Sequence, residues 1–542
     1  MSVEKLIVDH METWTSALQT RSTAGRGSSG KIDLYGIKKL RELILELAVR
    51  GKLVPQDPND EPASELLKRI AAEKAELVKQ GKIKKQKPLP EISEEEKPFE
   101  LPEGWEWARI NDIASFTNGY AFKSSEFQNS GVGIVKIGDI DSSGFISTAG
   151  MSYVSEKKIN VLPEEMRVNP GDMVIAMSGA TTGKLGFNKT KSTFLLNQRV
   201  GKIVTYSVDK EFIYHYLSTR IEENLSISLG SAIPNISTAQ INNIIIPIPP
   251  SDEQVKIIAR VKLLISLCDQ LEQQSLTSLD AHQQLVETLL GTLTDSQNAE
   301  ELAENWARIS EHFDTLFTTE ASVDALKQTI LQLAVMGKLL NNTNNADYKK
   351  LRTYLSFGPK NGLSPVESKK ETQLKVLKLG ATSYGQLNLN ETKFIDVDIE
   401  KDSHLFLKKG DILIQRGNSA NFVGCNVLIN EDYKNIIYPD LMMKIRTNDN
   451  LLPEYASIWL SSPLVRNFMW DRMTGTSGTM PKISKKIVEE IPIIVPEISI
   501  QQKWITTVNL MLDICSEIKY RLHKAKQTQQ HLADALTDAA IN

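Results

Sequence analysis

The stretch SGATTGK at 178–184 is the part of the chain that comes nearest to a phosphate-binding loop. A Walker A loop needs four residues between its glycines and a Ser or Thr after its lysine. Here three residues separate Gly179 from Gly183, and Leu185 follows Lys184. The stretch therefore predicts a corner between two strands rather than a nucleotide site, and Lys184 stays available for a DNA phosphate.

No other stretch has a catalytic motif. The sequence contains no HExxH, no paired CxxC and no GxSxG. It also has no aromatic-ended di-proline tetrapeptide of the adenine-methyltransferase kind, since Pro249-Pro250 is followed by Ser251. The 7 histidines are scattered, and the 3 cysteines form no CxxC. We therefore predict a non-catalytic, cytoplasmic chain without a metal site, whose thiols are reduced.

An internal repeat organises the chain. LRELILELAVRGKL at 40–53 and LKQTILQLAVMGKL at 326–339 agree at 9 of 14 positions. Two long segments, which begin at Ser251 and Ser499, also share one register, with apolar residues at alternating spacings of four and three. That spacing is typical of the seam of a coiled-coil helix. The pairs predict two copies of one large unit, and the alternative is two unrelated amphipathic helices.

The seam can be written out for each copy. In the first copy, Ser275, Ser278 and His282 interrupt it, and its apolar members are Ile257, Val261, Leu264, Cys268, Leu271, Leu285 and Leu289. In the second copy it comprises Trp504, Val508, Met511, Cys515, Ile518, Leu522, Ala525, Leu532 and Leu536.

Charge is distributed unevenly along the 542 residues, whose formal net charge is −4. Residues 251–344 hold 6 Lys+Arg and 14 Asp+Glu, whereas residues 345–496 hold 21 and 17. Residues 99–250 are close to balance, with 13 and 15. The central helical segment would repel phosphate and is expected to face protein, so any DNA groove must come from local clusters. No apolar run approaches the ~18 residues of a membrane helix.

Two strand-rich regions separate the helical segments. Short apolar strands are expected at 133–139, 171–179, 199–205 and 243–249, and a helix at 209–224. In the second region LKKGDILIQRG at 407–417 repeats the pattern of VNPGDMVIAMSG at 168–179.

We therefore predict an α+β protein in which two mixed α/β domains are joined by long antiparallel coiled-coil helices, as a tandem repeat with pseudo-two-fold symmetry. Five segments follow from this reading: an N-terminal helical region and linker at 1–98, the first strand-rich domain at 99–250, a central helical spacer at 251–344, the second domain at 345–496 and a C-terminal helix at 497–542.

A run of motifs in the first strand-rich region resembles a known family. LPEGWEW at 101–107, GYAFKSSEF at 119–127, GIVKIGDI at 133–140, GDMVIAMSGATTGK at 171–184 and LNQRVGKI at 196–203 are similar to the first target-recognition domain of type I restriction–modification specificity subunits. The order of domains and helices matches too, and the long N-terminal segment resembles the class IB branch. The second domain has RGNSANFVG where the first has MSGATTGK.

The resemblance implies a role and a set of partners. The specificity subunit reads a bipartite, asymmetric target in double-stranded DNA, with one half-site per recognition domain. It scaffolds two modification subunits, which bring S-adenosylmethionine and methylate adenine N6, and restriction subunits that use ATP and Mg. No cofactor is expected on this chain itself.

Base reading requires paired donors, with Arg or Lys for guanine and Asn or Gln for adenine. In the first domain the candidates are Lys123, Ser124, Lys136, Lys184, Asn197, Gln198 and Arg199. In the second domain they are Arg416, Asn418, Asn421, Lys482 and Lys485. Each could instead be a solvated surface or turn residue. The acidic centre leaves a second function open, that of a repeat-built protein-binding adaptor or regulator without DNA readout.

Overall fold

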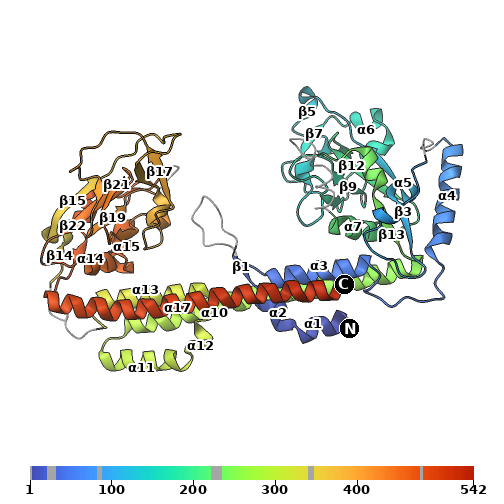
Figure 1. The fold of residues 1–542 in the computed structure, drawn as a ribbon. Coiled ribbons are helices and arrows are strands. Elements are labelled where there is room, and N and C mark those ends of the chain that lie inside the picture. The colour runs from blue at the N-terminus through green and yellow to red at the C-terminus, as the bar shows by residue number, and fades with distance from the viewer. Residues whose placement is uncertain are drawn as a thin grey trace. The chain divides into compact units, whose positions relative to one another are not determined.

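The structure, a computed structural model, describes residues 3–20, 32–81, 83, 88–220, 235–339, 347–475 and 480–541. The chain forms two compact units (Figure 1). Unit 1 comprises Met1–Leu18, Leu34–Gln274 and Gln529–Asn542, and unit 2 comprises Gln19–Asp33 and Ser275–Thr528. Each unit contains one strand-rich domain and a set of helices.

The strand-rich domain of unit 1 has its core between two sheets. One sheet has the order β10-β9-β12-β4 and the other the order β5-β7-β6-β11-β8. Buried Val135 and Leu196 of the second sheet meet Val174 and Val200 of the first in one apolar cluster. The strands are β4 Ala114–Asn118, β5 Phe127–Gln128, β6 Val132–Val135, β7 Ser152–Val154, β8 Arg167–Val168, β9 Met173–Ala176, β10 Leu185–Phe187, β11 Phe194–Leu196 and β12 Val200–Thr205.

The remaining elements of this domain are short. A third pair joins β3 Glu106–Arg109 to β13 Ile245–Ile248. The helices are α5 Ile110–Ile113, η2 Ser124–Glu126, η3 Ile137–Asp139, α6 Lys158–Val161, η4 Glu164–Met166, α7 Lys210–Thr219 and α9 Thr238–Asn243. The helix expected at 209–224 thus ends at Thr219, and 221–224 lie outside the described residues.

The strand-rich domain of unit 2 repeats this topology, except that its second sheet has four described strands where that of unit 1 has five. Its sheets have the orders β15-β22-β19-β20 and β17-β16-β21-β18, and a third pair joins β14 to β23. Among the described strands, β6 pairs parallel with β11 in the first domain, and β16 pairs parallel with β21 in the second. The strands are β14 Lys349–Lys350, β15 Leu355–Asn361, β16 Leu374–Leu377, β17 Thr392–Ile395, β18 Phe406–Leu407, β19 Asp411–Gln415, β20 Asn426–Leu428, β21 Tyr433–Ile437, β22 Met442–Thr447 and β23 Pro492–Ile493.

The helices of this second domain are η5 Leu351–Tyr354, η6 Leu379–Thr382, η7 Ala420–Phe422, α14 Pro453–Leu460, α15 Pro463–Trp470 and α16 Lys485–Glu489. The prediction of two mixed α/β domains of one design is confirmed.

The other helices carry the repeat. Unit 1 has α1 Val3–Asp9, α2 Met11–Ser16, α3 Tyr35–Val49, α4 Ala63–Lys79 and the one-turn η1 Glu94–Glu96. Unit 2 has the antiparallel pair of two-residue strands β1 Gln19–Thr20 and β2 Ile32–Asp33, and the helices α11 Ala299–Glu311, α12 Phe313–Leu316 and α13 Glu320–Val335. The 45-residue α10 Ser251–Asp295 and the 44-residue α17 Ile498–Ile541 each have residues in both units.

The repeated string ends its helix in the same way in both copies. Gly51 and Gly337 follow α3 and α13 with φ of +67° and +72°, a left-handed conformation that suits glycine. The next residue, Lys52 or Lys338, donates its backbone N–H to the carbonyl five residues earlier, at 2.8 and 3.0 Å. This pattern is the Schellman motif, which ends the helix at a glycine in both copies.

The same two lysines connect α3 to the end of α17 and α13 to the end of α10. Lys52 Nζ donates to the carbonyl of Ile541 in α17, at 2.6 Å. Lys338 Nζ donates to the carbonyls of Thr294 and Ser296 at the end of α10, at 2.6 and 2.8 Å. A cation at a helix C-terminus satisfies carbonyls that have no partner within the helix. The repeat therefore encodes a contact as well as a helix.

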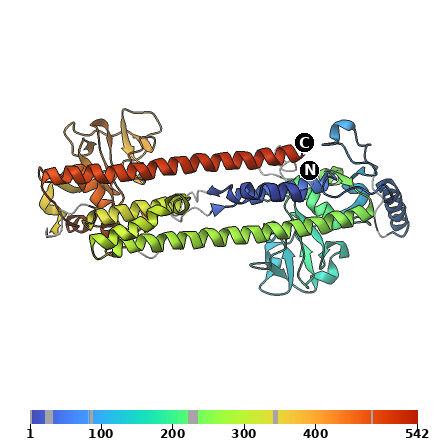
Figure 2. The same cartoon turned by 90° about the horizontal axis from the view of Figure 1, so that it is seen from below.

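Within unit 2, α13 packs against both long helices (Figure 2). Its start lies beside Lys519 of α17, which pairs with Asp324 at 2.9 Å. Near its end, Trp504 Nε1 donates to the carbonyl of Ala334 at 3.2 Å. His282 of α10 bonds to the Leu316 carbonyl just before α13, and Lys338 just after α13 reaches Thr294, so α13 runs parallel to α10. Because α13 is antiparallel to α17, the two long helices are antiparallel there.

Within unit 1, α3 has the matching place. Arg41 of α3 pairs with Asp269 and Glu272 of α10 at 2.6 Å each. Its Tyr35 donates to the carboxylate of Asp534 in α17 at 2.6 Å. The long helices are confirmed, and the repeated helices α3 and α13 supply the surface that buries them.

In the first half of each long helix the predicted seam residues are buried or partly buried. In the second half the buried residues lie one position after the predicted ones. In α10 Ile257, Val261, Leu264 and Cys268 are buried, but Leu285 is 52% exposed. The residues buried later in the two helices are Val286, Leu290 and Leu293, and Ala533 and Thr537, whereas Ala525 and Leu532 are exposed. A straight helix drifts by ~20° per heptad from a 3.5-residue repeat, so four heptads move the buried face by about one residue.

The cysteines behave as predicted. All three are free thiols, and Cys268 and Cys515 are buried in the helical packing. Burial raises the pKa of Cys268 to about 11 and also raises that of Cys515, which keeps both protonated and unreactive at neutral pH.

Candidate nucleic-acid interface

Four loops of the first domain meet at one edge. Tyr120 forms an isolated bridge with Asn197, and Gln198 donates its backbone N–H to the Tyr120 carbonyl at 3.0 Å. Asn197 in turn donates its N–H to the Val135 carbonyl. The stretch 178–184 joins them, because Met177 donates its N–H to the carbonyl of Arg199 at 2.9 Å. Segments far apart in the sequence thus form one loop edge.

The structure brings all seven candidates of the first domain to these loops. Lys123 and Ser124, at the start of η2, are exposed, as are Gln198 and Arg199. Asn197 is half-buried, and its Oδ1 accepts the Arg199 N–H at 3.3 Å, so this side chain caps the turn. These residues form a polar edge from which donors can reach outward.

Two lysines of this edge, Lys136 and Lys184, are less exposed than Lys123. Lys136 is half-buried, donates to Ser152 Oγ at 2.6 Å and lies 4.3 Å from the centre of the Phe127 ring. Lys184 ends the corner between β9 and β10, which pair antiparallel with Leu185 opposite Ile175, so the predicted strand corner is confirmed. Lys184 therefore lies on a corner that the pairing of β9 and β10 holds in place.

The corner contains two hydroxyl groups without a partner among the described residues. Ser178 Oγ and Thr181 Oγ1 are buried atoms that make no hydrogen bond within that part of the chain. By contrast, Thr182 Oγ1 donates to the Gly179 carbonyl at 2.6 Å. A buried hydroxyl without a partner costs free energy, so both groups are suited to meet a bound molecule.

The second domain forms the matching edge from 416–424 and 480–485. Ile483 donates its N–H to the Arg416 carbonyl at 2.9 Å, and Gly417 bridges Lys482. Arg416 is half-buried, whereas Asn421, Lys482 and Lys485 are exposed. Asn418 uses its side chain inside the loop, where Nδ2 donates to Gln415 Oε1 at 2.7 Å and Oδ1 accepts the Ser419 N–H.

Gln415 is a residue of this edge that the sequence reasoning missed. It is fully buried at the end of β19, and its Nε2 lies within 3.0 Å of the Leu379 carbonyl, Thr382 Oγ1 and Ser383 Oγ. Gln415 therefore connects the loop after β16 to the loop 416–424. The signal that could have found it is a polar residue in an apolar strand, at the place of Ala176 in the first domain.

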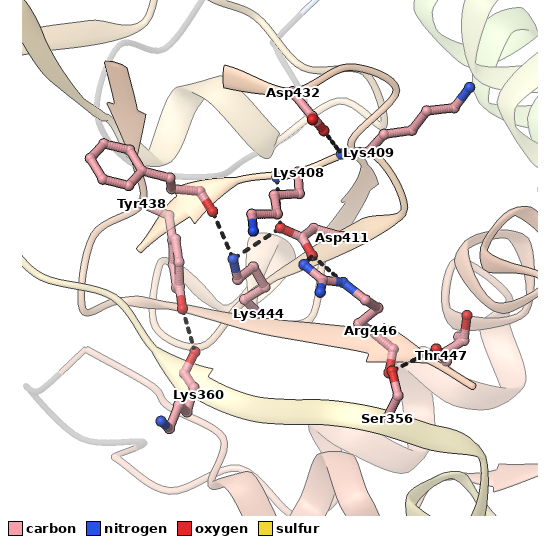
Figure 3. A network of polar contacts seen from close by, with 11 residues as sticks. Ser356, Lys360, Lys408, Lys409, Asp411, Asp432, Tyr438, Lys444, Arg446 and Thr447 are labelled. Carbon is pink, nitrogen blue, oxygen red and sulfur yellow. Dashed lines mark hydrogen bonds and ion pairs between the residues drawn. The ribbon is translucent and has the colours of Figure 1, made fainter. Parts of the chain in front are cut away.

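The second domain also holds a buried ion pair on the neighbouring strands (Figure 3). In the second domain Lys444 Nζ lies 2.9 Å from Asp411 Oδ2 and donates to the Phe406 carbonyl, and Arg446 binds Asp411 Oδ1. Burial lowers the pKa of Lys444, and the hydrogen bond to Asp411 opposes that shift.

The first domain has the equivalent pair at the same places. Lys202 Nζ lies 3.5 Å from Asp172 Oδ2 and donates to the Arg167 carbonyl. Both aspartates belong to the Gly-Asp pair that opens the repeated strand, β9 or β19. The pairs fix the strands that end in the loop edges, so the two domains share a frame and differ in the loops.

Two further searches concern other kinds of site. Within the described ranges, no three His, Cys, Asp or Glu side chains are grouped so as to hold a metal ion. In the same part of the chain, no helix is long and apolar enough to cross a membrane.

Comparison with known proteins supplies the family. Residues 102–281 match the model described as "Type I restriction modification DNA specificity domain". The specificity subunit of the type I restriction enzyme EcoEI from Escherichia coli is 42% identical over 611 aligned positions, and that of EcoAI from Escherichia coli is 45% identical over 609. Both alignments cover 100% of this chain and 100% of the relative.

One solved structure has the same fold at 16% identity and a TM-score of 0.51, covering 82% of this chain and 99% of its own. It was described in work on the "complex assembly" and "conformational transition of the type I R-M system". Full-length identity above 40% to two named relatives decides the assignment: this chain belongs to the specificity subunits of type I restriction enzymes.

Proposed function

We propose that each strand-rich domain reads one half of a bipartite, asymmetric target in double-stranded DNA through its loop edge. One observation carries the proposal: the two domains present different residues on equivalent loops. The corner after β9 is SGATTGK, and the loop after β19 is RGNSANF. Because the frames match and the donors differ, two different base sequences are the expected targets.

We further propose that the catalytic work belongs to partner subunits. The relatives are named as specificity subunits of restriction enzymes, which supports assembly with modification and restriction subunits. Two modification subunits with S-adenosylmethionine, and restriction subunits with ATP and Mg, are the partners we assign. The acidic balance of 251–344, with 6 Lys+Arg against 14 Asp+Glu, favours protein rather than DNA as the neighbour of that segment.

The adaptor function is the second candidate, and the same acidic segment favours it. It differs in one consequence, since an adaptor without readout would not change a DNA target. Purified alone with labelled S-adenosylmethionine and DNA, the chain should transfer no methyl group under either function. With its modification subunits, only the first function predicts methylation at a defined sequence.

The test is an exchange of residues 105–250 for the same domain of a relative with another target. The complex should then methylate sites in which one half has changed and the other has not, as mapped by single-molecule sequencing. A matched exchange of the second domain should change the opposite half. If both halves change together, or neither does, modular reading by these domains is wrong.

A further inference from the structure

Tyr384 is an exposed aromatic residue beside the loop edge of the second domain. It follows η6, and 82% of its side chain is exposed. Its ring meets that of Phe422 edge to face, with the centroids 5.8 Å apart and an angle of 81° between the planes. Phe422 belongs to 416–424, beside the candidate reader Asn421. The aromatic pair therefore lies among the residues already assigned to the interface.

The loop that carries Tyr384 is held in place by the buried side chain of Gln415 in β19. Its Thr382 is fully buried, and Gln415 binds Thr382 Oγ1 at 2.9 Å and Ser383 Oγ at 3.0 Å. On the other loop, Asn418 binds Gln415 at 2.7 Å. One buried side chain, that of Gln415, thus joins the two loops that carry the aromatic pair. An exposed ring on a fixed loop loses little conformational entropy when it binds.

The first domain has a serine at the equivalent place. Ile134 of β6 pairs with Leu195, and Val376 of β16 pairs with Ile437, so the parallel strands share one register. Counting eight residues onward from these partners gives Ser142 in the first domain and Tyr384 in the second. Ser142 is exposed as well. One loop position therefore differs in chemistry between two domains of the same frame.

An exposed ring adds little to the stability of the fold, because apolar surface left in water gains no burial energy. At a DNA surface, by contrast, an aromatic side chain can contact a thymine methyl or insert at a base step. We infer that Tyr384 contacts a base pair in the half-site of the second domain and helps to set its sequence, with Gln415 as its positioning residue. The inference rests on the proposed function.

The experiment uses the complete complex with its modification subunits and a target library in which each position of both half-sites is varied. Tyr384→Ala should lower discrimination about tenfold at one base pair of one half-site, near the lower end of what a bidentate base contact contributes. Tyr384→Phe should keep it, because the ring remains. Tyr348→Ala, which removes another exposed tyrosine (52%) of unit 2, is the matched control and should behave as the wild type.

Gln415→Ala should relax the same base pair as Tyr384→Ala, which a merely destabilising change would not single out. Unchanged discrimination in Tyr384→Ala would overturn the inference, and so would an effect on both half-sites or on assembly, which would indicate a protein contact. The domain exchange separates the two levels. If the exchange changes one half-site and Tyr384→Ala changes nothing, only the assignment of Tyr384 fails.

Discussion

Substituting one member of the buried Asp411–Lys444 pair should destabilise the second domain more than substituting both members. Lys444 is 1% exposed and Asp411 is fully buried, so neither charge is solvated by water. The attraction at 2.9 Å and the hydrogen bond to the Phe406 carbonyl offset the desolvation cost. Removing one partner leaves the other charge buried and uncompensated.

Asp411→Ala is therefore expected to destabilise the second domain by about 3–5 kcal/mol. The double variant Asp411→Leu with Lys444→Met should lose less, because no fully buried charge is left and Arg446, which also loses its bond to Asp411, is partly exposed. Hydrogen exchange of the β19 and β22 amides measures the effect within this domain. Asp432→Ala is the control, since that exposed carboxylate accepts the Lys409 N–H and is not buried. Equal losses in the single and double variants would contradict the argument.

His215 of α7 gives unit 1 a pH dependence. Burial lowers its pKa to about 4, with Lys262 acting in the same direction and Glu211 and Asp209 opposing it. In the unfolded chain this histidine has its ordinary pKa of ~6.5. The contribution of the neutral, buried imidazole to stability is therefore fully present above that pH. It falls as the pH is lowered from 6.5 towards 4, by at most ~1.4 kcal/mol per pH unit for this group.

His215→Gln should flatten the dependence of unfolding free energy on pH. Hydrogen exchange of the unit 1 amides, recorded between pH 7 and 4.5, would measure that dependence. The exposed His531 provides the control, because His531→Gln should leave the slope as it is. A wild-type slope that persists in His215→Gln would mean that other groups carry it.

At the scale of elements, local signals were predictable and the choice of packing partner was not. The helices α3 and α13 and their glycine stops follow from apolar periodicity and from the need for positive φ at Gly51 and Gly337. The phase of the late seam was missed because the helices keep 3.6 residues per turn. The sequence also could not show that α3 and α13 supply the surface that buries the long helices.

The candidate site divides in the same way. The repeated Gly-Asp strands indicated two equivalent frames, and the candidates of the first domain do meet at one edge. The internal use of Asn418, the connecting role of Gln415 and the exposure of Tyr384 depend on loop conformations. Loop conformations of this kind arise from tertiary contacts, which residue types and spacing do not reveal.

The long helices support a prediction at this scale. One heptad inserted after Thr277 of α10 adds ~10 Å, about three base pairs of DNA rise. Since α17 also contributes to both units, an insertion in α10 alone should destabilise the helical packing. A matched heptad after Lys524, the equivalent place in α17, should restore it and lengthen the unspecified spacer of the target by about three base pairs.

Methylation mapping of the single and double insertions gives the measurement. Both half-sites should stay unchanged in the double insertion, because neither domain is altered. If the double insertion methylates the original spacer, the long helices do not set the distance between half-sites.

At the scale of the whole molecule, each long helix begins in one unit and ends in the other. The end of α10 contributes Val286, Leu290 and Leu293 to the core of unit 2, around α13. The end of α17 contributes buried Ala533 and Thr537 to unit 1. Val286 and Leu290 correspond to Ala533 and Thr537 in the repeat register, 247 residues apart. The two ends are therefore structural equivalents.

This equivalence predicts the behaviour of a fragment of residues 1–295. The fragment keeps α3 and α10 but has neither α13 nor α17, so Val286, Leu290 and Leu293 lose the surface that buries them, at ~25 cal/mol per Å² of apolar area. Its α3 also lacks the end of α17. The end of α10 from a second copy can fill that place, which would give an isologous dimer. His282 is the weak point, because its bond to the Leu316 carbonyl is lost.

With two identical domains, the dimer and its modification subunits should methylate an inverted repeat of the first half-site. Sedimentation would measure the dimer, and methylation mapping would give the target. Val286→Asp with Leu290→Asp should make the fragment monomeric and inactive, whereas Leu285→Asp, at a position 52% exposed, should not. A fragment that stays monomeric, or that still modifies the original asymmetric site, would show that the helix ends are not interchangeable.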